Sequence, residues 1–252
     1  MNRKAFGDQI DIHGGGRDLI FPHHENEIAQ TEALTGKQFA QYWIHNGLIK
    51  VNGQKMSKSL GNSLLLKDLL DKYSAETIKF ALLQTNYRGD INVTDSLFPD
   101  AEKHLYDFYK VVLAVEEKFG TDGEFKEIDD DFNRAMSDDF NTALAISNLF
   151  GYFKRIKSLL NKDDKTCGDM VSQIRKTYSL LGLFTDDAKE VVKTYEDKES
   201  ASIPENVVKL AEERVNARKD RNWAESDRLR DEILSLGYVV KDSKEGYTLE
   251  KK

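Results

Sequence analysis

The sequence predicts an α/β module followed by a mainly α-helical bundle and a small α+β module at the C-terminal end. Short apolar runs alternate with glycine-containing turns over residues 1–95, a pattern typical of strands joined to helices. Residues 96–185 carry apolar side chains at helical spacing, and residues 204–252 combine two short helical patterns with two β-rich runs. Residues 186–203 are charged and poor in large apolar side chains, so we expect a linker there.

The composition indicates a helix-rich globular protein of the cytoplasm. The chain has 252 residues, of which 39% are hydrophobic and 32% charged, with only 3 prolines. No apolar run approaches the roughly 20 residues that span a bilayer, and the N-terminus lacks a signal-peptide pattern. The single cysteine, Cys167, excludes a disulfide within the chain. The net charge of −7 argues against non-specific nucleic-acid binding, although residues 205–252 are neutral overall and carry a local basic cluster.

Residues 10–16 predict a strand end that leads into a ligand-binding turn. Ile10 and Ile12 form a short apolar alternation, and His13 then precedes three consecutive glycines, residues 14–16. Because glycine lacks a side chain and tolerates positive φ, these glycines would let a ligand approach the backbone closely. A plain tight turn is the alternative for three glycines taken alone.

The helix predicted over His23 to Gly36 begins after Pro22, a residue favoured in the first helical turn. His23 and Glu27 lie four residues apart, so both side chains leave the same face of the helix. An imidazole nitrogen and a carboxylate oxygen at this spacing suit two of the positions around a tetrahedral zinc ion. The alternative is an ordinary His/Glu pair at a helix start, where Glu25 and Glu27 favour the positive end of the dipole.

An apolar block over residues 39–51 predicts a buried strand or short helix beneath this site, with His45 as a packed or hydrogen-bonded core histidine. The Asn-Gly turn signal at residues 52–53 then leads the chain into a Lys-Met-Ser-Lys-Ser run. Two lysines three residues apart, followed by Gly61, predict a flexible loop that presents ammonium groups to phosphates. We therefore predict that Lys55 and Lys58 contact phosphate groups.

Amphipathic helices are predicted over Leu64–Gln84, Phe98–Phe119, Asp129–Leu160 and Thr166–Leu183. Within the third stretch, Asp138 and Asp139 are adjacent and would diverge by about 100° on a helix, which argues against a metal site. We expect instead a helix start that is capped by Asp or Ser, with Phe140 in the core.

The last module opens at Pro204 with two helices, the second of which ends at Gly237, and closes with a β-hairpin. The corner between the helices combines positive charge with an aromatic ring, in residues Arg214, Arg218, Lys219, Arg221 and Trp223. Cations beside a stacking surface suit an RNA loop. A solvated corner with a core tryptophan is the alternative.

Two motifs give the chain a family resemblance. The run His-Gly-Gly-Gly-Arg-Asp-Leu-Ile-Phe-Pro-His-His-Glu-Asn-Glu (13–27), followed by Lys-Met-Ser-Lys-Ser-Leu-Gly-Asn (55–62), resembles the cysteinyl-tRNA synthetases, which are class I aminoacyl-tRNA synthetases. The likeness continues in Ser-Asp-Asp-Phe-Asn-Thr (137–142) and in the last module. It implies the second half of a Rossmann-like catalytic domain, then a tRNA-binding helical bundle and an anticodon-binding module.

The resemblance also implies a reaction in protein synthesis. Cysteine and ATP, the latter with Mg²⁺, would give cysteinyl-adenylate and pyrophosphate, and the cysteinyl group would then move to tRNA(Cys). The matching positions are His23 and Glu27 for two of four zinc ligands, His13 for the cysteine pocket, Lys55 and Lys58 for catalysis, and Lys58, Gly16 and Asp18 for ATP. The five corner residues named above would contact the tRNA, and we expect a monomer.

The sequence departs from this family in what it lacks. The other two zinc ligands of the family, both cysteines, and its His-Ile-Gly-His-type signature do not occur, and Cys167 lies in the predicted bundle. Because an open parallel sheet needs its first half to cover the second, we expect a C-terminal part of a longer enzyme, inactive alone. With two ligands we expect zinc not to be retained.

Two alternatives remain from the sequence. One is a stand-alone tRNA-binding protein, which needs a first module that is stable by itself. The other is a related ligase that joins cysteine to an amino-sugar in thiol biosynthesis. Residues 205–252 argue against the second alternative, because a small-molecule acceptor needs no RNA-binding module.

Overall fold

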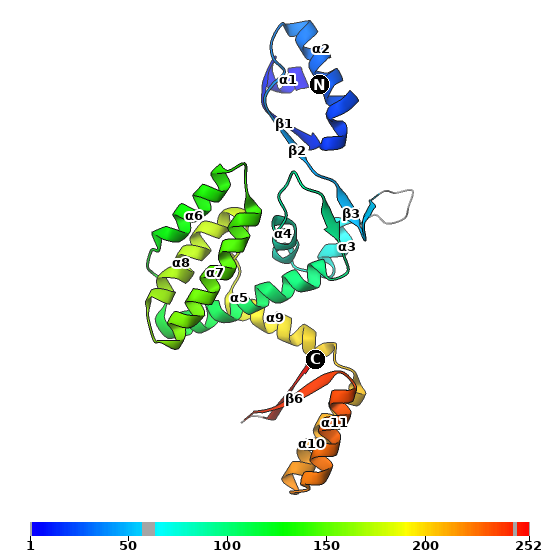
Figure 1. Cartoon of the computed structure of the whole chain (residues 1–252), viewed down its shortest axis with the longest axis vertical. Coiled ribbons are helices and arrows are strands. Elements are labelled where there is room, and N and C mark those ends of the chain that lie inside the picture. Colours follow the sequence, from blue (N-terminus) through cyan, green and yellow to red (C-terminus); the bar gives the residue numbers. More distant parts are fainter. Residues whose placement is uncertain (1, 57–63, 244–245, 252) are drawn as a thin grey trace. The chain divides into compact units, whose positions relative to one another are not determined.

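The chain folds into two units, residues 1–188 and 189–252, which Figure 1 draws from a computed structural model. The structure describes residues 2–56, 64–243 and 246–251. Among these described residues, none of the helices combines the length and the apolar composition that crossing a bilayer requires.

The first unit begins with a two-stranded parallel sheet of β1 (Ile10–Gly16) and β2 (Ala40–Asn46). Helix α1 (Asn2–Phe6) precedes β1, and the short segments η1 (Arg17–Leu19) and η2 (Ile20–His24) lead into helix α2 (Glu25–Thr35). Gly36 ends α2 in the left-handed conformation, at φ 68°. The three glycines predicted to form a turn lie inside β1 instead, paired with Ile44 to Asn46 of β2.

A second small sheet follows along the chain. Strand β3 (Ile49–Val51) pairs antiparallel with β4 (Gln54–Lys55) and parallel with β5 (Ile91–Val93). Asn52 and Gly53 connect β3 to β4 with φ angles of 48° and 81°, the signature of a type I′ hairpin turn, so this prediction is confirmed.

The helix predicted over residues 64–84 divides into α3 (Leu66–Leu70) and α4 (Ala75–Leu83). The division occurs because Ser74 caps α4: its hydroxyl oxygen accepts a hydrogen bond from the Thr77 amide at 3.0 Å. Glu76, in the first turn of α4, is only 6% exposed. Its carboxylate accepts hydrogen bonds from the Tyr109 hydroxyl (2.9 Å) and the Phe184 amide (2.5 Å), and burial raises the pKa of Glu76.

Helices α5 (Leu97–Phe119), α6 (Lys126–Ser137), α7 (Thr142–Asn161) and α8 (Thr166–Tyr178), with the short segment η4 (Ser179–Leu181), form the helical bundle in green and yellow in Figure 1. Their apolar faces meet in a core in which Phe108 stacks on Phe153, with ring centroids 4.2 Å apart. Full burial of each such side chain stabilises the fold by roughly 2–3 kcal/mol.

A turn separates α6 from α7 within the stretch predicted as helical, at the place where a helix start was expected. Asp139 and Phe140 both adopt positive φ, 52° and 53°, which costs about 1 kcal/mol or more for each non-glycine residue. Asn141 caps α7 by accepting a hydrogen bond from the Leu144 amide at 3.0 Å. Phe140 is 53% exposed, so the prediction that it lies in the core is wrong.

The second unit contains most of helix α9 (Ala188–Ala201), helices α10 (Glu205–Lys219) and α11 (Trp223–Ser235), and the antiparallel hairpin of β6 (Tyr238–Ser243) and β7 (Gly246–Lys251). The stretch predicted to be a linker is therefore largely helical. Its less exposed residues recur at helical spacing, at Ala188, Val191, Val192 and Tyr195. The small core between α10, α11 and the hairpin consists of Val207, Ala211, Ile233 and Val240.

Candidate functional site

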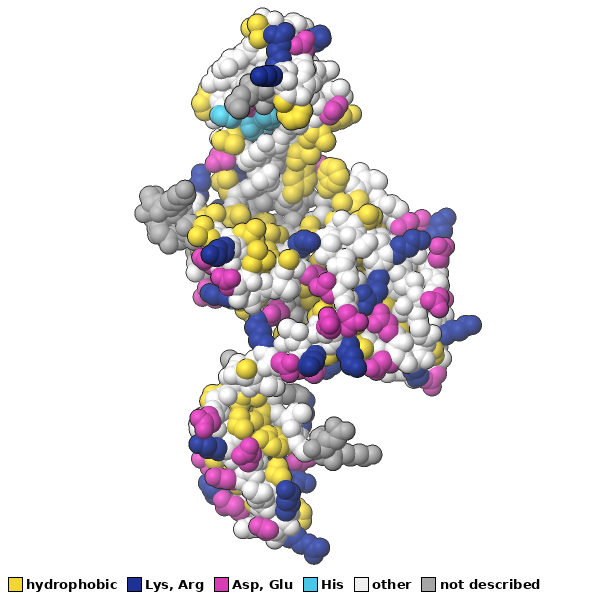
Figure 2. Space-filling model, turned by 180° about the vertical axis from the view of Figure 1, so that it is seen from behind, with side chains coloured by type: hydrophobic (Ala, Val, Ile, Leu, Met, Phe, Trp, Pro, Cys, Tyr) yellow, Lys and Arg dark blue, Asp and Glu magenta, His cyan; other side chains and the backbone are white. Residues whose placement is uncertain are grey.

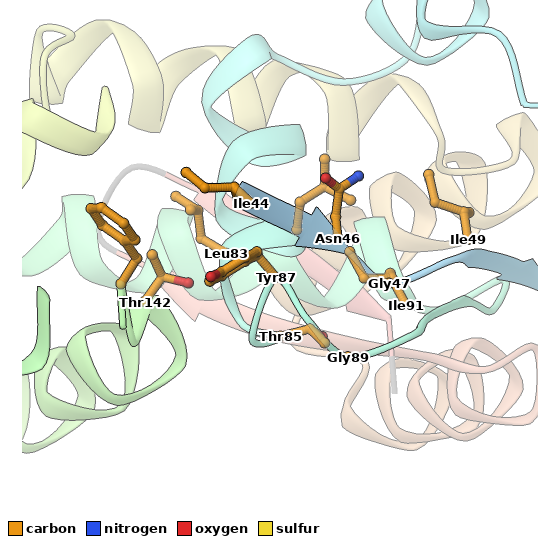
Figure 3. A pocket seen from close by; sticks show the side chains of 12 residues that line it. Ile44, Asn46, Gly47, Ile49, Leu83, Thr85, Tyr87, Gly89, Ile91 and Thr142 are labelled. Atoms are coloured by element: carbon orange, nitrogen blue, oxygen red, sulfur yellow. The ribbon is translucent and has the colours of Figure 1, made fainter. Parts of the chain in front are cut away.

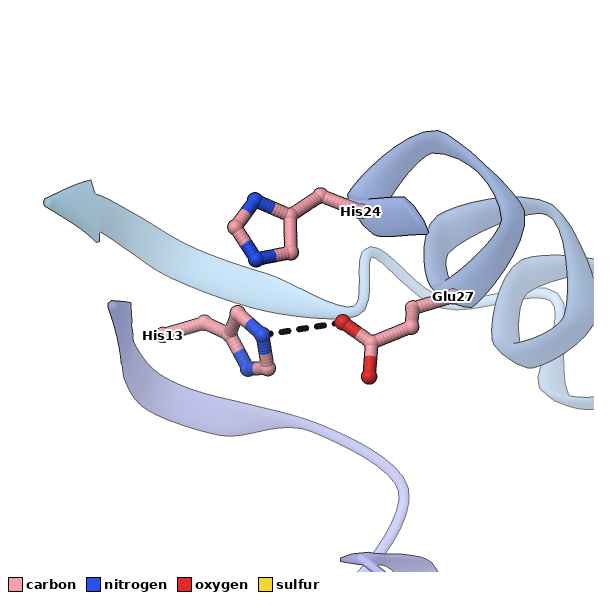
Figure 4. A group of neighbouring side chains, drawn as sticks. All are labelled: His13, His24 and Glu27. Atoms are coloured by element: carbon pink, nitrogen blue, oxygen red, sulfur yellow. Dashed lines mark ion pairs between the residues drawn. The ribbon is translucent and has the colours of Figure 1, made fainter. Parts of the chain in front are cut away.

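A histidine–glutamate cluster forms where β1 meets α2 (Figure 4). His13 comes from β1, His24 ends η2 and Glu27 lies in the first turn of α2. His13 Nε2 lies 2.9 Å from Glu27 Oε2, and one nitrogen or oxygen of each residue lies within 4.8 Å of the others. Glu27 Oε2 is buried and accepts no hydrogen bond of good geometry among the described residues. The cluster therefore presents a carboxylate oxygen and imidazole nitrogens at one place.

His24 is the most buried member of this cluster, at 3% exposure. Burial lowers its pKa, and the neighbouring His13 and His45 lower it further, while Glu27 opposes them. His24 Nδ1 lies at hydrogen-bond distance, 2.9 Å, from His45 Nε2. The Trp43 ring covers the same place, 4.7 Å from the His13 ring. A neutral imidazole with an available lone pair is the form of histidine that binds metals.

Gly15 makes room for the His24 ring. A Cβ atom added to Gly15 would lie 2.8 Å from His24 Cε1 and 2.9 Å from Nε2, whereas one added to Gly14 would meet only Ile44 O at 3.5 Å. The sequence led us to expect glycines that admit a ligand to the backbone. At Gly15 the structure admits a side chain of the protein instead.

His23 and Glu27, the predicted metal pair, lie near each other but not in close contact. His23 Nε2 lies 3.7 Å from Glu27 Oε1, and the His23 side chain is 61% exposed. Sequence reasoning missed His24. His45 was predicted as a packed or hydrogen-bonded histidine, and its ring lies at hydrogen-bond distance from that of His24. The doublet of adjacent histidines was the available signal, because two consecutive side chains cannot both face the same buried space. Figure 2 shows histidine side chains (cyan) gathered at one place on the surface.

The donor set fits a zinc ion. Two imidazoles and a carboxylate are ligands that zinc takes in proteins, and an unsatisfied buried carboxylate oxygen such as Glu27 Oε2 is the group that a cation would satisfy. Cys167 is buried in α8 and is not a member of this donor set.

The positions predicted for ATP lie at the end of β1. Asp18 folds back over Gly16, since an added Cβ on Gly16 would lie 2.6 Å from Asp18 Oδ1. Lys55 Nζ, at the end of β4, lies 3.4 Å from Asp18 Oδ2, and both side chains are exposed. Lys58 lies outside the described residues. The structure thus brings together two of the three positions predicted for ATP, Gly16 and Asp18, with Lys55, which was predicted for catalysis.

Asp90 connects this end of β1 to β3, which sequence reasoning did not foresee. Its carboxylate accepts hydrogen bonds from the Leu48 amide at 3.0 Å and from Arg17 Nη2 at 2.9 Å, and pairs with Lys50 Nζ at 2.9 Å. The Leu48 amide and then Lys50 hold the pKa of Asp90 down at about 2. The carboxylate therefore remains charged at any physiological pH.

An apolar cavity of about 450 Å³ is lined by residues of β2, β3 and β5, by the end of α4 and by residues where α6 is joined to α7 (Figure 3). It is lined by Ile44, Asn46, Gly47, Ile49, Leu82, Leu83, Thr85, Tyr87, Gly89, Ile91, Phe140 and Thr142. Phe140 and Tyr87 face each other edge to face across it, with ring centroids 6.5 Å apart.

The basic corner of the second unit divides into two groups. Arg214 is buried, and its guanidinium binds Asp242 of β6 at 2.7 and 3.1 Å, while Arg218 reaches the same carboxylate at 2.5 Å. Lys219, Arg221 and Trp223 are exposed where α10 meets α11, and the Trp223 side chain is not part of the core. Arg214 thus has an internal ion pair, and the exposed three present charge and a ring to solvent.

Comparisons with known proteins bear on the whole chain. Residues 1–103 match the family model "tRNA synthetases class I (C) catalytic domain", residues 131–185 match "DALR domain", and residues 200–248 match "Cysteinyl-tRNA ligase anticodon binding domain". A solved LeuRS–tRNA–LeuAMS complex from Agrobacterium radiobacter K84 is similar in fold. The TM-score is 0.53 at 16% identity, over 72% of this chain and 30% of that one. The fold and these models define a class I aminoacyl-tRNA synthetase.

Relatives of the chain indicate which of the class I synthetases it resembles. Proteins named cysteine–tRNA ligase align with 98% of this chain at 37% identity in Geobacter metallireducens and at 41% in Pseudomonas entomophila, and with 97% of it at 40% in Pseudomonas putida strain F1. The chain belongs to the cysteine–tRNA ligase family. It spans about half the length of these relatives, 56%, 53% and 52% respectively.

Proposed function

We propose that this chain supplies the amino-acid pocket and the tRNA-reading parts of a cysteine–tRNA ligase. In the first step the cysteine carboxylate would attack the α-phosphorus of ATP, forming cysteinyl-adenylate and releasing pyrophosphate. In the second, a hydroxyl of the terminal tRNA ribose would attack the cysteinyl carbonyl and release AMP. The observation that carries the proposal is that 97–98% of the chain aligns with cysteine–tRNA ligases. We place the reaction in the cytoplasm and expect a monomer.

The histidine–glutamate cluster is the proposed cysteine site. Glu27 belongs both to the predicted pair with His23 and to the observed cluster with His13 and His24. We propose that Glu27 holds zinc together with His24 or His23, and that His13 lines the cysteine pocket. Bound zinc would favour a thiolate over a hydroxyl, and so would distinguish cysteine from serine.

The protein's own groups around this pocket would exclude water and fix the substrate. Trp43 and Phe39 pack against the His13 ring at 4.7 and 5.2 Å, which lowers the local dielectric. We further propose that Gly16 and Asp18 contact the ribose of ATP and that Lys55 and Lys58 stabilise the charge that develops on the departing pyrophosphate.

For the tRNA we propose Lys219, Arg221 and Trp223 as direct contacts. Their exposure at the α10–α11 corner supports this role, since an accessible ring can stack on an unpaired base while the cations pair with phosphates. Arg214 and Arg218, which were also predicted contacts, would support the corner through Asp242.

The test of the activity is cysteine-dependent exchange of pyrophosphate into ATP by protein purified from its source, with the intact mass recorded on the same sample. Exchange that serine does not support would establish the ligase half-reaction. If exchange is absent while tRNA(Cys) still binds, the protein of the recorded mass binds tRNA but does not act as a ligase.

The test of the tRNA surface compares two variants of the second unit. Trp223→Ala should weaken binding of tRNA(Cys) by about 1–3 kcal/mol, the usual contribution of a stacked base. Arg228→Ala is the matched control, because Arg228 lies on the same helix but pairs with Glu225 and Glu232 at 2.7 and 2.8 Å. Equal losses in the two variants would remove the corner from the RNA site.

A further inference from the structure

The turn formed by residues 86–90 packs tightly against the corner between β2 and β3. The Tyr87 carbonyl accepts a hydrogen bond from the Gly47 amide at 2.8 Å, and Asp90 Oδ1 accepts one from the Leu48 amide at 3.0 Å. A Cβ atom on Gly47 would lie 1.9 Å from a carbonyl oxygen of the turn. The turn and this corner are therefore bonded directly and packed closely.

The same turn reaches the nucleotide end of the candidate site. Asp90 Oδ1 lies 2.7 Å from Arg17 Nη2, and Arg17 follows β1 directly, between Gly16 and Asp18. The carboxyl group of Asp90 thus holds the guanidinium of Arg17, whose neighbours along the chain are the two residues proposed to contact ATP. A displacement of the turn would change the position of the two residues proposed to contact ATP.

From the opposite side, Asp139 holds this turn. Arg88 Nε and Nη2 donate to the Asp139 carboxylate at 2.5 and 2.9 Å, and the Tyr87 hydroxyl donates to it at 2.8 Å. Asp139 makes these contacts from a left-handed backbone conformation that directs its side chain out of the bundle. Arg88 holds the pKa of Asp139 down at about 2, so the ion pair persists throughout the range of an enzyme assay.

On the side that faces the helical bundle, the contacts of the turn are mainly these polar ones. The cavity of about 450 Å³ lies directly beside the turn, and its lining includes Tyr87, Gly89, Phe140 and Thr142 (Figure 3). Interdigitated apolar side chains would lock two elements together, but an open cavity does not. A bidentate arginine–carboxylate pair supplies the directional contact instead.

We propose that Asp139 is a positioning residue: through Arg88 and the 86–90 turn it holds Asp90 and Arg17 in place at the nucleotide end of the site. The helical bundle thereby sets the geometry of the ATP-binding end from outside the site. This inference rests on the proposed function, because Gly16 and Asp18 contact ATP only if that function holds.

Asp139→Asn tests the inference in the full protein. It keeps the size of the side chain and removes the charge that binds the Arg88 fork. We expect the Kd for ATP, measured by calorimetry, and the KM for ATP in pyrophosphate exchange to rise by about tenfold, with kcat nearly unchanged. Hydrogen–deuterium exchange at the Gly47 and Leu48 amides should accelerate by about fivefold, because both amides bond to the turn.

Glu127→Gln is the matched control. It breaks the Glu127–Arg155 pair of α6 and α7, which spans 3.0 Å between side chains 53% and 47% exposed, close to the 49% and 53% of Asp139 and Arg88. We expect no change in ATP affinity or in exchange at Gly47 and Leu48. Arg88→Lys keeps the positive charge but loses the two-pronged guanidinium contact with Asp139, so it should reproduce the effect of Asp139→Asn. It replaces Asp139→Asn in the test if that variant does not fold.

The unaltered protein tests the proposed function, and the Asp139→Asn variant tests this inference. A lack of ATP binding by the unaltered protein refutes the proposed function and, with it, a role of Asp139 in ATP binding. If the unaltered protein binds ATP, unchanged ATP affinity in Asp139→Asn refutes the positioning role. Unchanged amide exchange at Gly47 and Leu48 refutes the mechanical link from Asp139 to the turn, whatever the activity.

Discussion

Replacing Asp242 by asparagine should destabilise the second unit by leaving a buried cation without its partner. Arg214 has a side chain only 4% exposed, and both of its bonds to Asp242, at 2.7 and 3.1 Å, would lose their charge. Arg214 Nε already has no hydrogen-bond partner among the described residues. The loss of the two charged bonds is therefore not offset by a hydrogen bond from Nε.

The size of the expected loss in stability follows from the exposed fractions of the Arg214 and Asp242 side chains. Breaking a fully buried ion pair costs about 3–5 kcal/mol, and we discount this to about 2–3 kcal/mol because water screens a partner that is 42% exposed, as Asp242 is. A unit of this size has a free energy of unfolding of roughly 5 kcal/mol, so the loss is about half of it. With a urea m-value of about 1 kcal/mol/M, the unfolding midpoint should fall by roughly 2 M.

The assay is urea unfolding followed by tryptophan fluorescence in a Trp43→Phe background. The chain has two tryptophans, so Trp223 then reports on the second unit alone. Lys209→Ala is the control, since its pair with Glu205 is 66% and 84% exposed and should contribute less than about 0.5 kcal/mol. A loss in Asp242→Asn as small as in this control would refute the buried-charge reasoning.

Three further predictions concern the first unit. Zinc affinity, measured by titrating the protein with zinc, should fall by at least about tenfold in His24→Ala and by less in exposed His23→Ala; the reverse order would place the metal on the outer face of α2. Gly15→Ala should displace the His24 ring, weaken zinc binding and cost about 1–3 kcal/mol of stability, whereas Gly14→Ala should leave both unchanged; an equal effect of the two would contradict this steric argument. Because burial raises the pKa of Glu76, its contribution to stability is present below its ordinary pKa of 4.5 and is lost as pH rises through the higher folded value. Glu76→Gln should therefore gain stability relative to the unaltered protein as pH rises from 4.5 to 8 in denaturation series, and a constant difference would count against a raised pKa.

Local sequence signals predicted the elements that depend on neighbouring residues. The Asn-Gly turn at residues 52–53, the end of α2 at Gly36 and the start of α10 after Pro204 were confirmed, because turns and caps are determined within four or five residues. The break at Ser74 was missed, because continuous apolar periodicity covers it. A helix start near residue 140 was expected, but its cap is Asn141 and not Asp or Ser. The ion pair that Asp139 makes with Arg88, 51 residues away, has no local signal.

The candidate site shows the same division between local and long-range information. Spacing along one helix selected Glu27, and the resemblance selected His13, which the structure brings to 2.9 Å from it. Which of two adjacent histidines is buried depends on the space above Gly15 and on His45 of β2, and spacing within α2 carries neither fact. Likewise, Asp90 interacts with Arg17 across 73 residues, a contact that no local pattern encodes.

The hydrogen bond between Glu76 and the Phe184 amide has a consequence for synthesis on the ribosome. The two residues are 108 positions apart, so roughly 5–20 s of translation separate their appearance. Until Phe184 emerges, the nascent chain can supply Tyr109 but lacks the backbone donor that helps satisfy the buried carboxylate. Helix α4 therefore cannot complete its native surroundings during elongation of α5 to α8. The first unit should close in a late, concerted step, and a ribosome stalled before residue 184 should hold it in a form that proteases still cut.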